Sequence, residues 1–142
     1  MRAITKVLLV ALVAVAPAAA LGSGYVVVAN PSVRASTLTR GELSRIFLRL
    51  SSEWPTGEHA RPVDQGKAAP IREAFSRDAL GKSVAAVDQF WVQAIFSGRA
   101  VPPIEKRNDA EVIAYVRDTP GAIGYVAASA PTEGLKQIAV KD

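Results

Sequence analysis

The chain has 142 residues, of which 49% are hydrophobic and 21% are charged, and this length and composition suit one globular domain. It contains no cysteine, which excludes disulfide bonds and metal sites built on thiolates. The formal net charge of +4 falls to about +2 when Arg2 and Lys6 of the N-terminal leader are set aside. That charge is too small to indicate a nucleic-acid partner, and the basic residues are spread along the chain without interleaved aromatic residues.

Residues 1–20 have the three parts of a secretory signal peptide: a basic start, an apolar run over 7–16, and the small residues Ala18-Ala19-Ala20 as cleavage site. The apolar run is too short to span a bilayer comfortably. No cysteine follows the cleavage site to carry a lipid anchor. An uncleaved anchor is the alternative interpretation. We therefore expect residues 21–142 to form one domain that is exported to the periplasm and is not embedded in the membrane.

The first predicted elements are a strand and a helix. Residues 25–29 are a continuous β-branched run, as expected of a strand covered on both faces, and Asn30-Pro31-Ser32 ends it. In the following helix Thr39 caps the first turn and Glu42 completes a capping box. The apolar face of this helix is expected to consist of Leu43, Ile46, Phe47 and Leu50.

Two further helices are predicted in the middle of the chain. Pro62-Val63-Asp64 is a short predicted strand, and a helix begins after it at Pro70, a favoured first-turn position. The next helix is capped by Ser83 and ended by Gly98. The first of these helices is expected to bury Ile71, Ala74 and Phe75, and the second Val84, Val87, Trp91, Ala94 and Ile95.

The C-terminal third contains a predicted loop over residues 99–107, a helix over 108–117 and a strand over 137–140. Between the last two, Thr119-Pro120-Gly121 stops the helix and leads at once into a buried apolar run in which Gly124 permits close approach of another backbone or of a ligand. We expect this run to be the central strand. The alternation of elements predicts an α/β fold with three αβα layers and a mostly parallel sheet.

Several short motifs follow one another in a set order along the chain. They are Leu43-Ser44-Arg45-Ile46-Phe47-Leu48, Trp54-Pro55-Thr56-Gly57, Pro62-Val63-Asp64, Arg72-Glu73-Ala74-Phe75, Phe90-Trp91, Ile95-Phe96-Ser97-Gly98 and the stretch 119–126. In this order they resemble the phosphate-binding proteins of bacterial ABC importers, in the type II periplasmic-binding superfamily, and the short members of that group most of all. The resemblance implies a single αβα lobe that recognises phosphate or another small oxyanion through helix N-termini, without enzymatic turnover.

The sequence departs from the family pattern in two respects. The family encloses its ligand between two lobes, and this chain has residues for one. Ala69-Pro70-Ile71 stands where the family has Ser-Gly-Thr, and Gln65 stands where it has an arginine, so two hydroxyls, a backbone donor and a fixed charge are missing. We expect weak anion binding, or binding completed by a partner. The alternative is a degenerate lobe that lost its ligand and docks on a membrane transporter, a sensor or an envelope protein.

The candidate anion ligands follow predicted strands, at the edge of an α/β sheet where ligands bind. They are Asn30, Ser32, Gln65, Gly66, Lys67 and Arg72. The last four surround the turn into the second helix, and we expect the first two to reach the same edge. The alternative interpretation is an ordinary solvated loop and an Asn-Pro-Ser turn, with no ligand.

His59 is the only histidine, and it lies in a polar loop. A catalytic triad with Asp64 is disfavoured because no serine lies on a strained strand-to-helix elbow. A metal site with Glu53 and Glu58 is also disfavoured, since a solvated loop accounts for the same residues. The sequence therefore predicts neither an enzyme nor a cofactor.

Overall fold

The structure is a computed structural model that describes residues 24–142, so the predicted signal peptide over residues 1–20 lies outside the described residues. The described elements follow in the order β1 (Tyr25–Ala29), β2 (Thr37–Thr39), α1 (Arg40–Phe47), β3 (Arg61–Gln65), α2 (Pro70–Ala79), α3 (Val84–Phe96), β4 (Ile104–Lys106), α4 (Asp109–Asp118), β5 (Ala122–Ala127) and β6 (Lys136–Lys141).

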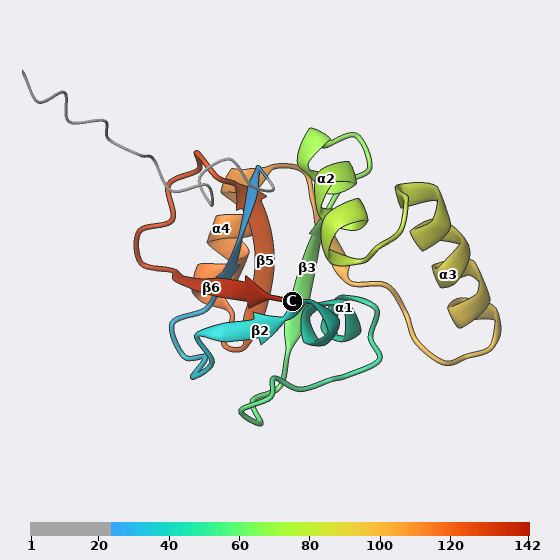
Figure 1. Cartoon of the computed structure of the whole chain (residues 1–142), viewed down its shortest axis with the longest axis horizontal. Coiled ribbons are helices and arrows are strands. Elements are labelled where there is room, and N and C mark those ends of the chain that lie inside the picture. Colours follow the sequence, from blue (N-terminus) through green and yellow to red (C-terminus); the bar gives the residue numbers. More distant parts are fainter. Residues whose placement is uncertain (1–23) are drawn as a thin grey trace, which may run out of the picture.

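The strands form one sheet in the order β2-β6-β1-β5-β3-β4 (Figure 1). β3 is parallel to both β4 and β5, and β2 is parallel to β6. β1 runs antiparallel to both of its neighbours, β5 and β6. The sheet is mostly parallel, as predicted, and β5 lies inside it between β1 and β3.

The helices cover the sheet on both faces, which gives the three predicted layers. Successive side chains of a strand point to opposite faces. In β1, Tyr25 and Val27 join the core beneath α1 and α2, whereas Val28 joins the core beneath α4. In β5, Tyr125 lies on the first face and Val126 on the second. Both faces of β1 and β5 are therefore buried, as their continuous apolar runs predict.

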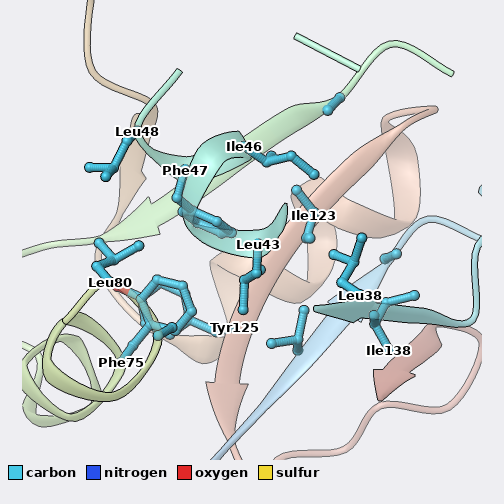
Figure 2. Packing of buried hydrophobic residues seen from close by; sticks show 14 of the residues in the cluster. Leu38, Leu43, Ile46, Phe47, Leu48, Phe75, Leu80, Ile123, Tyr125 and Ile138 are labelled. Carbon is cyan, nitrogen blue, oxygen red and sulfur yellow. The ribbon is translucent and has the colours of Figure 1, made fainter. Parts of the chain in front are cut away.

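Aromatic rings hold α1 and α2 against the sheet (Figure 2). The ring of Phe75 on α2 stacks on Tyr125 of β5 with the centroids 3.8 Å apart and the planes 6° apart. Phe47 of α1 meets Phe75 edge-on at 4.8 Å. The predicted capping box of α1 is confirmed, because Thr39 accepts from the Glu42 amide at 3.1 Å and Glu42 accepts from the Thr39 amide at 2.8 Å.

The layer beneath α4 depends on Gly124. A Cβ atom at this position would lie 2.8 Å from Cγ1 of Val112 on α4 and 2.9 Å from Cγ1 of Val63 on β3. Those distances are shorter than van der Waals contact, so only glycine lets α4 lie this close to the sheet. The prediction of a close approach at Gly124 is confirmed, but the approaching groups are side chains of α4 and β3, and neither another backbone nor a ligand.

Some predicted buried faces are wrong. Leu50 is 46% exposed because α1 ends at Phe47, and Ile95 is 53% exposed because it lies on the outer side of α3. The second helix, α2, buries Arg72, Phe75, Ser76 and Ala79, while Ile71 and Ala74 are only half-buried. The loop predicted over residues 99–107 contains the edge strand β4, and β2 was not predicted. No helix within residues 24–142 combines the length and the apolar character needed to cross a bilayer.

Candidate functional site

The parallel strands β3, β4 and β5 end at the same edge of the sheet, and a groove of about 480 Å³ lies there between the starts of α2 and α4. We call it the edge groove. Its lining residues come from the strand ends and the first turns of the two helices: Gln65, Ala68, Ala69, Pro70, Ile71, Arg107, Asn108, Asp109 and Ala127. This is the edge at which α/β sheets bind ligands.

Two helix N-termini contribute positive potential to the edge groove. The N-cap of α2 is Ala69, which offers no side-chain cap, and Pro70 follows it with no N–H group. The N-cap of α4 is Asn108, whose side chain accepts from the Glu111 amide at 3.0 Å. Arg107 adds an exposed guanidinium, which pairs with Glu111 at 2.9 Å. Helix N-termini and an arginine are groups that favour an anion.

An acidic side chain already occupies the edge groove. Asp109 accepts from the Gln65 amide nitrogen Nε2 at 2.8 Å through one oxygen, and from the Ala127 backbone N–H at 3.3 Å through the other. The carboxylate therefore takes two of the donors at this edge. Its negative charge also opposes the entry of a second anion.

Gln65, the first predicted anion ligand, lines the edge groove but has no donor left for a ligand. It is 2% exposed. Its amide group donates to Asp109 and, at 3.0 Å, to the Tyr125 carbonyl oxygen, which uses both of its N–H bonds. Its backbone N–H donates to Asp64 at 2.9 Å and to the Tyr125 hydroxyl at 3.2 Å.

Arg72, a second predicted ligand, is buried beneath the sheet edge and does not line the edge groove. Its Nη1 donates to the Gln65 carbonyl at 2.6 Å and to Glu105 at 3.3 Å, and it lies 3.4 Å from Asp64. The Nε atom is buried without a hydrogen-bond partner. The guanidinium therefore forms ion pairs with Asp64 and Glu105 within the protein.

Asp64 and Tyr125 complete this buried polar cluster, which we define as Asp64, Gln65, Arg72 and Tyr125. The Tyr125 hydroxyl donates to Asp64. Burial raises the pKa of the Asp64 carboxyl, although Arg72, Tyr125 and the Gln65 amide each act to lower that pKa. Burial and the nearby Asp64 carboxylate raise the pKa of the Tyr125 hydroxyl, which therefore stays protonated.

The other two residues of the predicted turn have partners outside the edge groove. Lys67 pairs with Asp88 of α3 at 2.8 Å and thus connects the turn to that helix. Gly66 donates its backbone N–H to the Lys106 carbonyl at 3.0 Å, which continues the pairing of β3 with β4. Neither residue lines the groove.

Asn30 and Ser32 lie near the beginning of β5, whereas Gln65 lies near its end. The expectation that these residues share one edge of the sheet with Gln65 is therefore wrong. The reason is the antiparallel direction of β1. Asn30 donates to the carbonyls of Val116 and Arg117 at 2.9 and 3.0 Å and accepts from the Ser32 amide at 2.9 Å. Its side chain therefore binds the C-terminal turn of α4.

His59 is exposed and lies in a loop bridge with Glu53. Among residues 24–142 there is no group of three or more His, Cys, Asp and Glu side chains arranged to hold a metal ion.

Two groove residues, Arg107 and Asp109, were not predicted from the sequence. Arg107 directly follows β4 and Asp109 begins α4 shortly after it, and the three residues of β4 were assigned to a loop. Recognition of β4 as a strand would have placed Asp109 at the start of a helix after a parallel strand, where site residues are expected.

Comparison with solved structures identifies the fold class. The chain matches an ABC-type phosphate transport receptor from Vibrio cholerae with a TM-score of 0.64 and 16% identity, over 82% of this chain and 46% of that one. It matches a phosphate ABC transporter substrate-binding protein of Clostridium perfringens, described with bound phosphate, with a TM-score of 0.67, 16% identity, and coverages of 82% and 44%. It matches PstS from Borrelia burgdorferi with a TM-score of 0.63 and 13% identity, over 82% of this chain and 47% of that one.

The described part of the chain therefore has the fold of about half of each of these phosphate transport receptors and substrate-binding proteins. The chain spans less than half the length of these neighbours. No protein-family profile matches the sequence, and no curated protein matches it.

Proposed function

We propose that the chain is an exported, periplasmic-binding-like lobe that recognises a protein and has no small-molecule ligand of its own. The observation that carries the proposal is Asp109 in the edge groove. Its carboxylate accepts from Gln65 and Ala127, the donors that an incoming oxyanion would need. The lobe keeps the fold of a solute binder, while its own side chains fill the site.

Other predicted ligands support the same proposal. Arg72 is bound to Asp64 and Glu105 inside the protein, and Asn30 is bound to the end of α4 at the other edge. Solute binders of this class close two lobes around the ligand, and the chain covers 46% of the Vibrio cholerae receptor. Its activity would be recognition without turnover, and its partners would be a transporter, a sensor or another envelope protein met in the periplasm.

A thermal-shift panel tests the proposal. The protein is heated with millimolar phosphate, sulfate, carboxylates and phosphonates, and we expect no rise in Tm. A ligand at about 100 times its Kd would stabilise the native state by about 2.7 kcal/mol, which is easily measured. A clear rise with any of these anions would overturn the absence of a ligand.

A second candidate function is weak oxyanion recognition at the edge groove. It is favoured by the N-termini of α2 and α4 and by Arg107, which line the groove together. In that case Asp109→Asn, which removes a negative charge and keeps the size of the side chain, should increase the Tm rise with phosphate. Arg107→Gln should abolish it. An equal response of all three proteins would reject this candidate.

A further inference from the structure

The edge groove lies beside the point where the described part of the chain begins. β1 starts next to the end of β5, where Tyr25 pairs with Ala127, a lining residue of the groove (Figure 1). Gly24 has a φ of 71°, in the left-handed region that glycine accepts, so the extended backbone of β1 ends there. The residues immediately before Gly24 are therefore joined to the domain at the rim of the groove.

The groove holds a negative charge that no cation of the described residues balances. Asp109 is half-buried, and its carboxylate accepts hydrogen bonds from two uncharged donors. Within residues 24–142 no lysine or arginine forms an ion pair with it. The guanidinium of Arg107, which also lines the groove, pairs with Glu111 instead. A carboxylate has about four lone-pair positions, so this one can still accept from a positively charged donor.

The wall of the groove at the start of α2 is apolar. It consists of Ala68, Ala69, Pro70 and Ile71, and Ile71 is half-buried. One negative charge beside an apolar wall fits a group that combines a cation with an aliphatic side chain. A leucine with a free α-amino group is such a group.

We propose that the edge groove binds the N-terminus of the processed chain, with the α-ammonium of Leu21 on the Asp109 carboxylate and the Leu21 side chain against α2. This inference rests on the exported form in the proposed function, because cleavage after Ala20 is what exposes an amino group at Leu21. An α-amino group has an ordinary pKa of about 7.7–8.0, so it is mostly protonated at neutral pH. The processed chain thus fills its own groove in place of a solute.

The chain is long enough for this contact. Ala128 donates its backbone N–H to the Gly24 carbonyl at 3.1 Å. The adjacent amide, that of Ala127, donates to Asp109 at 3.3 Å. Because neighbouring amide nitrogens are less than about 4 Å apart, the Gly24 carbonyl and the Asp109 carboxylate lie within about 10 Å of each other. The three residues 21–23 can span about 10 Å when extended, so an amino group on Leu21 can reach the carboxylate.

The test measures the reactivity of the α-amino group in the protein that the cell exports. The protein recovered from the periplasm is treated with acetic anhydride at a series of pH values, and mass spectrometry of its N-terminal peptide gives the rate of acetylation. The ion pair favours the charged, unreactive form of the amine and raises its pKa. At neutral pH we expect the folded protein to react about three- to tenfold more slowly than the same protein unfolded in guanidinium chloride.

Two substitutions on α4 locate the contact. Asp109→Asn removes the negative charge and keeps the size of the side chain, and it should return the rate of acetylation to that of the unfolded protein. Asp118→Asn is the matched control, because it makes the same change at the exposed last residue of the same helix, at the end away from Asp109. It should keep the slow rate.

Equal rates in the folded and unfolded wild type would overturn the proposal, and that comparison does not depend on the folding of any variant. Slow acetylation in a folded Asp109→Asn protein would overturn it too, as would an exported product without a free amine on Leu21. The anion panel tests the ligand-free function separately. A fast-reacting terminus with no anion response rejects only this contact, and a slow-reacting terminus with an anion response rejects only the ligand-free function.

Discussion

Among single residues, Asp64 shows how burial and an ion pair compete. The carboxyl is buried next to Arg72 and accepts hydrogen bonds from Tyr125 and from the Gln65 amide. Burial is the largest influence on its pKa and raises that pKa above the ordinary aspartate value. The fold therefore favours the protonated form of this carboxyl more than the unfolded chain does.

The pH dependence of stability should show this preference. Above about pH 4 the unfolded chain has an ionised Asp64, while the native state still holds the proton until the raised pKa is reached. The native state then binds more protons, so the free energy of unfolding falls as pH rises through that range. Asp64→Asn cannot titrate, and urea unfolding of both proteins at several pH values measures the difference.

We expect the stability of the wild type relative to Asp64→Asn to decrease as pH rises above about 4. Asparagine is the matched control because its side-chain oxygen can still accept from Tyr125 and Gln65. A relative stability that increases with pH would mean that the attraction of Arg72 exceeds the cost of burial, and would contradict the expectation.

Gly124→Ala should destabilise the domain by about 1–3 kcal/mol, the usual cost of overpacking a core. The added methyl would lie within 2.9 Å of both Val112 and Val63, and α4 would have to move away from the sheet. Gly66→Ala is the control, because nothing lies within 4 Å of a Cβ atom there. Chemical denaturation of both variants checks the prediction, and equal stabilities would contradict it.

At the scale of the elements, local signals stabilise the helices. Thr39→Ala removes the side-chain acceptor of the α1 capping box and should lower the free energy of unfolding by about 1 kcal/mol. Thr37→Ala is the control, since Thr37 is exposed on the edge strand β2 and lies outside the box. Thermal unfolding compares the two, and a loss in Thr37→Ala as large as in Thr39→Ala would argue against capping.

The same local signals explain which elements could be predicted from the sequence. The four helices have caps and apolar periodicity that can be read from neighbouring residues, and β1, β3, β5 and β6 have apolar runs or β-branched residues. β2 and β4 are three residues long, which is too short for a period of two to be seen. Because β4 was not predicted, Asp109, the residue that occupies the edge groove, was not predicted as a site residue either.

The burial of Arg72 and the direction of β1 were both missed, but only the first could have been predicted from the sequence. Arg72 shares its helix face with Phe75 and Ser76, at spacings of three and four residues, so its burial could have been predicted from the pattern. The direction of β1 could not, because a continuous apolar run looks the same in either direction. Asn30 was therefore assigned to the wrong edge.

At the scale of the whole molecule, the predicted signal peptide over residues 1–20 makes a prediction about the exported protein. We expect an exported product that begins at Leu21, because Ala18-Ala19-Ala20 provides the small residues of a cleavage site. Intact-mass measurement of the protein recovered from the periplasm of an expression host checks this. A product with the mass of all 142 residues, found in the membrane fraction, would instead indicate an uncleaved anchor.

The reversed course of β1 has a practical consequence for studies of this protein. Tyr25 pairs with Ala127, which lines the edge groove, and the Gly24 carbonyl accepts from Ala128 at 3.1 Å. Any fusion partner or purification tag joined ahead of Gly24 thus leaves the sheet beside the groove and can mask it in a screen. Such screens should use a protein with a native, processed start and with any affinity handle placed elsewhere.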